Sequence, residues 1–388
     1  MSPRLATFLV FGVNGAMIGT WVAHIPWLQD HLGMSKSTLG VCLLCMAAGA
    51  LISMPLTGHL VDRRSSASVT RWATVVFCLM LPLPLLATSP YMLGAVLFVF
   101  GASNGAMDVS MNAHGVGIQE RLDRPVMSSF HGGWSVGGFA AAALVALASA
   151  SGLDPRVESL VVGVCLVLLG LWFTARLGPA SVRSSAGHGL ALPTRPVILI
   201  GGLCFLVMLA EGAIADWSGI YLRHDTGASP AAAATAFAGF SLGMAVARLC
   251  GDHVNARIGA VRLLRAGTAL VAIALGALLL VGDTIPAVIG FAVCGLGIAN
   301  AVPLLFTAAG RIDPPGPSLA AAFTLGYTGF IVGPPVIGLL SDQTGLPQTL
   351  ALLVVALLAV TVLGRRAMGA SPERSTAGAP VAVGETAP

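Results

Sequence analysis

Four ionisable side chains lie inside long apolar stretches of this sequence. They are Asp108, Glu211, Asp216 and Arg248. A charged side chain at the centre of a bilayer costs about 2.5 kcal/mol or more, so ionisable residues in such stretches are functional candidates by default. The chemistry they suggest is proton binding, ion pairing or solute recognition.

Asp108 is the strongest of these candidates. Asn104, Asp108 and Asn112 follow one another at intervals of four residues, so on a helix they form one polar stripe. A polar stripe in lipid must face a cavity. Burial favours the neutral form of a carboxylic acid, so we predict that Asp108 carries a proton. The alternative is a structural acid paired with an arginine or a histidine.

Glu211 and Asp216 lie five residues apart on another apolar stretch. On a helix this spacing turns the two side chains about 140° apart, so both cannot face one cavity wall. We expect one of them to line the solute path and the other to pair with a neighbour, and Glu211 is a candidate second proton-coupling residue. For Arg248 we favour a side chain that snorkels towards a membrane surface. The alternative is a partner for an acid between two halves of the protein.

Aromatic side chains with a polar edge suit sugar-like or drug-like ligands, although anchoring at the membrane interface is an equal alternative. His131, close to Trp134 in the sequence, could add a hydrogen-bonding or proton site. The predicted substrate-binding residues are Trp21, His24, Asn104, Asn112, His131, Trp134, Asp216, Trp217, Asn300 and Tyr327.

The elements that position these residues are membrane-spanning helices. Of the 388 residues, 56% are hydrophobic and 9% are charged, against about 25% charged in ordinary soluble domains. The apolar stretches are too long and too uniformly apolar for barrel strands. We predict an all-α membrane protein with spans at 5–28, 38–60, 70–88, 91–114, 126–150, 157–176, 196–221, 232–254, 261–281, 284–308, 317–341 and 347–364.

Arginine placement predicts the topology. If the N-terminus is cytoplasmic, sixteen basic residues fall in cytoplasmic segments, and only Lys36, Arg156 and Arg223 fall outside. The positive-inside rule therefore predicts that both termini are in the cytoplasm of a multi-pass inner-membrane protein.

Short sequence segments of the first half of the chain recur in the same order in the second half. The matching segments are Gly15-Ala16…Trp21 with Gly212-Ala213…Trp217, Gly58–Asp62 with Gly251–Asn255, and Phe130–Ser135 with Phe323–Thr328. Equivalent helices are six spans apart, so the two halves run parallel. We predict six-helix halves at 1–176 and 196–364, a cytoplasmic linker at 177–195 and a disordered tail at 365–388.

A loop motif, Gly58-x-x-x-Asp62-Arg63, lies at the end of the second predicted span. A degenerate copy from Gly251 to Arg257 lies at the end of the eighth. Glycine permits close helix packing, and an aspartate can cap a helix or pair with an arginine across the halves. We predict a gate at the cytoplasmic side formed by Gly58, Asp62, Arg63, Arg248, Gly251 and Arg257. We also expect Gly333-Pro334-Pro335 to break its helix.

Several function classes lack their signatures. The sequence has no phosphate-binding loop, no nucleophile elbow, no metal-ligand cluster and no basic run with interleaved aromatics. We therefore expect no enzyme activity, no cofactor, no metal and no nucleic-acid partner. The expected partners are a small-molecule substrate, protons and the lipid bilayer, and we expect a monomer.

These residues together resemble the major facilitator superfamily, and within it the YbjJ-like bacterial subgroup. The segments that carry the resemblance are 104–112, 129–137, Glu211-Gly212…Asp216-Trp217, Phe240–Met244…Arg248 and 332–335. A more distant similarity is to the fucose–galactose–hexose proton symporters, which have an acid in helix 4 followed four residues later by asparagine. Asp108 and Asn112 match that pattern, which implies a role for Asp108 in proton coupling. The symporters' second acid, in helix 1, has no counterpart here.

The sequence therefore predicts a secondary transporter that works by alternating access, coupled to protons. We favour import of a sugar-like or other polar metabolite. Export of a metabolite or drug is the alternative, and a membrane sensor or assembly partner without transport is a further one.

Overall fold

The computed structural model describes residues 1–122, 126–180 and 194–369, and every regular element in those ranges is a helix. The elements are α1 (Pro3–Leu32), α2 (Lys36–Arg63), α3 (Ser66–Met80), η1 (Pro84–Leu86), α4 (Pro90–Leu122), α5 (Met127–Ala150), α6 (Pro155–Thr174), α7 (Arg195–His224), α8 (Pro230–Ile258), α9 (Ala260–Val281), α10 (Thr284–Ile298), α11 (Ala301–Ala309), α12 (Pro315–Thr344) and α13 (Leu346–Gly369). Within these ranges, 12 helical segments are long and apolar enough to cross a membrane, as predicted.

Serine side chains cap the N-termini of several of these helices. Ser35 accepts a hydrogen bond from the Thr38 N–H, and Ser229 accepts one from the Ala232 N–H. Such caps satisfy backbone donors that a helix start leaves free. The main helix contacts join helices that are not consecutive, such as α1 with α5 and α2 with α4.

Four details differ from the sequence prediction. Helix α3 ends at Met80 and a short 3₁₀ turn follows, because Pro82 and Pro84 cannot continue an α-helix. The predicted span 284–308 divides at Asn300, whose side chain donates to the Ala247 carbonyl on α8.

The other two differences lie near the C-terminus. Helix α12 continues through Pro334 and Pro335, so the predicted break is wrong; the Pro334 carbonyl packs closely against Gly40 of α2, and such neighbours help a helix to tolerate proline in a membrane. The predicted tail at 365–388 begins too early, because α13 continues to Gly369, and 370–388 lie outside the described residues. Most of the predicted linker also lies outside them.

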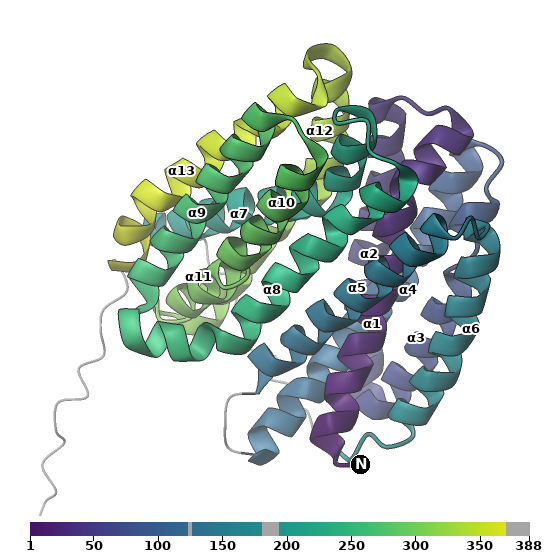
Figure 1. Cartoon of the computed structure of the whole chain (residues 1–388). Helices are drawn as coiled ribbons and strands as arrows, with labels where there is room; N and C mark the ends of the chain where they lie inside the picture. Colours follow the sequence, from purple (N-terminus) through teal and green to yellow (C-terminus); the bar gives the residue numbers. More distant parts are fainter. Residues whose placement is uncertain (123–125, 181–193, 370–388) are drawn as a thin grey trace, which may run out of the picture.

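Glycines bring the same pairs of helices into close contact within each half. Gly15 of α1 lies against the Trp134 backbone of α5, and Gly329 of α12 lies against the Phe205 backbone of α7. Gly49 of α2 lies against Phe98 of α4 in the same way, and α8 meets α10 through Gly243. Small residues at helix interfaces let membrane helices pack backbone to backbone. The packing therefore repeats the parallel-halves arrangement, with α1–α6 and α7–α13 side by side (Figure 1).

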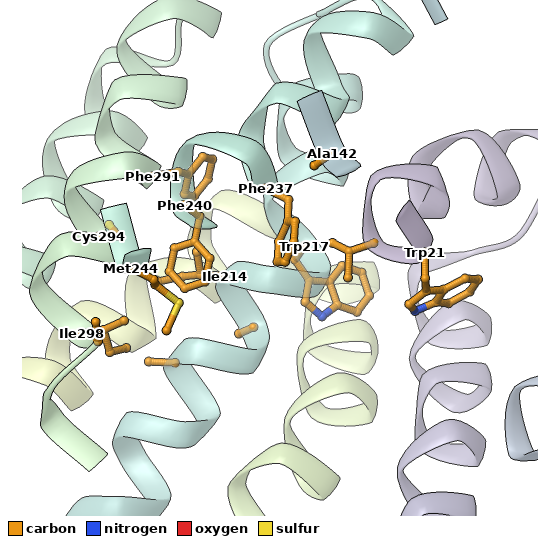
Figure 2. Packing of buried hydrophobic residues seen from close by; sticks show 14 of the residues in the cluster. Trp21, Ala142, Ile214, Trp217, Phe237, Phe240, Met244, Phe291, Cys294 and Ile298 are labelled. Carbon is orange, nitrogen blue, oxygen red and sulfur yellow. The ribbon is translucent and has the colours of Figure 1, made fainter. Parts of the chain in front are cut away.

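A continuous apolar core runs through both halves. Figure 2 shows part of it, where Phe240 and Met244 of α8 lie close to Phe291 and Cys294 of α10, and Phe237 of α8 lies beside Trp217. All of these side chains are buried. This packing fixes the helices that carry the polar residues described below.

The bundle has two ends, and the halves are joined by charge at one of them. We call the end where α1 begins and α13 finishes the terminus face, and the opposite end the far face. At the far face, Asp30 of α1 accepts from Arg223 of α7 at 2.9 Å and lies 3.2 Å from His224. Asp342 of α12 accepts from the backbone N–H groups of Lys36 (3.1 Å) and Ser37 (2.9 Å) at the start of α2. In the described part of the chain, no ion pair joins the halves at the terminus face.

Candidate functional site

A chain of polar side chains crosses the middle of the N-terminal half. Trp134 Nε1 of α5 donates to Asn14 Oδ1 of α1 at 2.8 Å, and Asn14 Nδ2 donates to Asn104 Oδ1 of α4 at 3.1 Å. The close contact at Gly15 holds α1 against α5 at this level. The chain thus links three helices and leaves Trp134 and Asn104 half-buried.

Arg248 of α8 joins this chain to the C-terminal half. Its Nη1 donates to Ser135 Oγ of α5 at 2.8 Å, its Nη2 lies 3.5 Å from Glu211 Oε1 of α7, and its guanidinium lies 5.8 Å from the centre of the Trp134 ring. The Arg248 and Glu211 side chains are 14% and 17% exposed. The favoured expectation that Arg248 snorkels to a membrane surface is therefore wrong. The acid partner of the alternative is present, because a largely buried guanidinium needs a counter-charge and Glu211 supplies it. Both residues belong to the C-terminal half, and the hydrogen bond to Ser135 is the contact between the halves.

Asp108 and Asn112 lie on one face of α4, as the spacing predicts. Asn112 Nδ2 donates to Asp108 Oδ1 at 3.1 Å and to the Asp108 carbonyl at 2.9 Å. Tyr327 of α12 lies close enough to interact electrostatically with both Asp108 and Glu211. Among the described residues, no basic group lies within ion-pair distance of Asp108.

Aromatic rings border this central region on the side of α12. The Tyr327 ring stacks on Phe323 with centroids 4.2 Å apart, and Phe323 stacks on Phe306 of α11 at 5.3 Å. On α5, His131 meets the Phe11 ring of α1 edge-on at 5.3 Å. Phe323 is exposed, and Tyr327 and His131 are half-buried.

Three residues of the predicted substrate-binding set lie elsewhere. Trp21 and Trp217 are 1% and 0% exposed and belong to the core, so a solute cannot reach them in this conformation (Figure 2). His24 is also buried, and its Nε2 lies 2.6 Å from Glu158 Oε2 of α6, near the far face. The rotation of α1 accounts for two of them: the Trp21 ring lies 5.7 Å from the Phe100 ring of α4, and His24 contacts Glu158 of α6.

Asp216 and Asn300 complete the predicted set. Asp216 is half-buried and has no hydrogen bond or ion pair among the described residues. Asn300 is held against α8, where it bonds to the Ala247 carbonyl and abuts Gly251. Glu211 is thus the acid of α7 that has the central ion pair.

The predicted gate residues of the loop motif lie at the terminus face. Asp62, Arg63 and Arg257 are exposed, and within the described chain none of them forms an ion pair. Nothing within van der Waals reach would meet a side chain at Gly58. That these residues form a gate stays a prediction. It concerns a conformation in which the terminus face is closed.

Sequence reasoning did not single out Ser135 or Glu158, which the structure places in polar contacts. Ser135 lies one residue after Trp134, so a serine beside a candidate aromatic residue was the available signal. Glu158 lies in the first turn of α6, where an acid is ordinarily explained by the helix dipole. Only the tertiary structure shows that its side chain is buried.

The arrangement suits reversible binding of a polar molecule rather than bond chemistry. Among the residues the structure describes, no three His, Cys, Asp or Glu side chains are grouped as metal ligands would be. The central groups are amides, an ion pair, a carboxyl group and aromatic rings. They can exchange hydrogen bonds with a solute, and the carboxyl group can exchange a proton.

This fold and this site define a class of protein: a membrane carrier made of two parallel six-helix halves with polar groups between them. The sequence profile of the Major Facilitator Superfamily matches residues 5–220 and 200–386. The chain is 35% identical to an uncharacterized MFS-type transporter of Yersinia pestis over 364 residues, covering 93% of this chain and 94% of that protein. It is 34% identical to an uncharacterized transporter of Sinorhizobium fredii, covering 93% and 97%.

A solved structure shows the same fold. The nucleoside transporter NupG superposes with a TM-score of 0.74 at 14% identity, covering 94% of this chain and all of that one. The chain belongs to the Major Facilitator Superfamily and is an integral, multi-pass membrane transport protein.

Proposed function

We propose that this protein is a proton-coupled secondary transporter that imports a sugar-like or other polar organic solute by alternating access. The observation that carries the proposal is the difference between the two central acids. Glu211 has the Arg248 guanidinium as counter-charge, whereas Asp108 has only an amide from Asn112. A carboxylate without a counter-charge in a membrane interior is so costly that Asp108 must hold a proton, or lose it only when the site opens to water.

The solute class is inferred from the groups around Asp108. Arg248 and Glu211 neutralise each other, so the site offers no net positive charge to an anion. Asparagine amides both donate and accept, which suits hydroxyl groups, and the stacked Tyr327 and Phe323 rings suit the C–H face of a sugar. The resemblance of Asp108 and Asn112 to the fucose–galactose–hexose symporter pattern supports the same class.

A thermal-unfolding screen identifies the ligand. The purified protein is heated with sugars, sugar acids, nucleosides, amino acids and amphipathic drugs at about pH 5.5 and about pH 7.5. A ligand at 100 times its dissociation constant stabilises the folded state by about 2.7 kcal/mol. Stabilisation by a sugar that depends on pH supports the proposal, and stabilisation by amphipathic compounds alone favours export.

Asp108→Asn then tests the coupling in proteoliposomes with the ligand found. We expect this variant to lose accumulation driven by a proton gradient and to keep counterflow exchange, because solute binding remains while the proton site is gone. Glu120→Gln, an exposed acid on the same helix, is the matched control and should behave like the wild type. Undiminished pH-dependent accumulation by Asp108→Asn would refute Asp108 as the proton carrier.

The import direction depends on orientation, for which the arginine distribution predicts cytoplasmic termini. Accumulation in vesicles that are acidic outside and carry the far face outwards would support import, because solute and proton then move in the same direction. Accumulation only when the inside of the same vesicles is acidic would show exchange of solute for protons and would favour export.

A further inference from the structure

A second pair of titratable groups is buried close to the far face, apart from the central site. His24 Nε2 of α1 lies 2.6 Å from Glu158 Oε2 of α6, and the two side chains are 5% and 4% exposed. Both residues belong to the N-terminal half. Nothing in the proposed function uses this pair.

The burial of the pair favours the state in which it holds one proton more than a neutral imidazole and a carboxylate. A contact of 2.6 Å requires a hydrogen between the two atoms, which either an imidazole N–H or a carboxylic acid O–H can supply. Glu158 Oε1 is buried and has no hydrogen-bond partner among the described residues. Loss of a proton from the pair would therefore leave a negative charge whose second oxygen has no donor, and such a charge is strongly unfavourable in a protein interior.

The pair borders a small cavity that has walls from both halves. Its volume is about 40 Å³, enough for a water molecule. Trp27, Asp30 and Ser149 line it from the N-terminal half, and Arg223 and Pro230 line it from the C-terminal half. Separation of the halves at the far face would remove two of these walls and bring water to His24 and Glu158.

The charged groups around the cavity connect the pair to the contacts that close the far face. Asp30 accepts from Arg223 of α7 at 2.9 Å and also lies 3.2 Å from His224. Arg156 of α6 donates to His31 Nε2 of α1 at 2.7 Å. An ionised Glu158 would compete with Asp30 for Arg223, so loss of the proton should loosen the contact between α1 and α7.

We propose that His24 and Glu158 form a second proton-binding site, which exchanges protons with the compartment at the far face and favours closure of that face when it is protonated. The proposal rests on the proposed alternation of the halves. It depends neither on Asp108 nor on the identity of the solute. Its ligand is a proton, and its effect is a pH-dependent opening of the cavity.

Thiol labelling measures this opening without a substrate. In full-length protein whose native cysteines are replaced, Ser149→Cys places a thiol in the cavity wall, and Ser151→Cys places one on the exposed end of the same helix. A water-soluble maleimide labels both thiols in liposomes over a range of pH. The ratio of the two labelling rates cancels the pH dependence of the thiol reaction.

We expect the ratio to rise with pH by up to about tenfold per pH unit, the limit for release of one proton. In Glu158→Gln the ratio should stay low and flat, because the amide cannot ionise. His24→Gln should also flatten the profile, since it removes the other member of the pair. His59→Gln, an exposed histidine on α2 that does not line the cavity, is the control and should keep the wild-type profile.

A Glu158→Gln protein with an unchanged profile would overturn the proposal, and so would a flat profile in His59→Gln. Thermal unfolding shows whether each variant is folded. If Glu158→Gln does not fold, the labelling profile of His24→Gln is compared with that of the wild type instead. Asp108→Asn should keep the profile. If the transport test refuted Asp108 as the proton carrier, the labelling result for His24 and Glu158 would still hold. A flat labelling profile in the wild type would refute the His24–Glu158 site and leave the proposed function untouched.

Discussion

Removal of Arg248 should destabilise the protein far more than removal of its whole ion pair. In Arg248→Met, the Glu211 carboxyl group keeps its buried position but loses its counter-charge, and Ser135 loses a donor. Breaking a buried pair from one side costs about 3–5 kcal/mol. The N–O distance of 3.5 Å and side-chain exposures of 14% and 17% place this pair at the lower end, so we expect a loss of about 3 kcal/mol.

The double variant Glu211→Gln/Arg248→Met distinguishes charge from shape. It removes both charges while keeping similar side-chain volumes, so its unfolding free energy should lie within about 1 kcal/mol of the wild type. Reversible unfolding in mixed micelles, as the fraction of denaturing detergent rises, measures both variants. The difference between the two variants, at least about 2 kcal/mol, is the cost of leaving the Glu211 charge without its partner.

Arg257→Met provides the control on the same helix. Arg257 is exposed at the terminus face, so its replacement should change the unfolding free energy by no more than about 0.5 kcal/mol. The reasoning is refuted if the double variant is as unstable as Arg248→Met, because the loss would then come from packing. Equal losses for Arg248→Met and Arg257→Met would refute the burial of the pair itself.

Three further substitutions test the packing and the far face. Gly49→Ala should cost about 1–3 kcal/mol in the same unfolding assay, because a methyl group would overlap the Phe98 backbone; Gly202→Ala, on an open helix face, should be neutral or stabilising. Trp134→Phe should cost about 1 kcal/mol by removing the hydrogen bond to Asn14, and an unchanged unfolding free energy would count against that bond. Asp30→Asn should raise maleimide labelling of a cysteine at position 149 up to about fivefold, since the partly exposed pair contributes at most about 1 kcal/mol; unchanged labelling would show that Asp30 does not hold the far face closed.

The spans and the polar stripe of α4 follow from local sequence. An apolar stretch without charge can satisfy its backbone in lipid only as a helix, so length and hydropathy determine twelve spans. The spacing of Asp108 and Asn112 places them on one helix face, because helical geometry depends on residue separation alone. For the same reason, the five-residue spacing of Glu211 and Asp216 predicts that they face different surroundings.

Partners that come from different helices were decided by the tertiary structure. Arg248 could have reached a membrane surface or an acid, and only the packing of α8 against α5 and α7 brings it to Ser135 and Glu211. The rotation of α1 likewise turns His24 towards Glu158 of α6, 134 residues away in the chain, rather than towards a solute. A single sequence specifies which faces are apolar and where charges lie along each helix. It leaves helix rotation and tilt open, because these depend on the simultaneous packing of many side chains from distant segments.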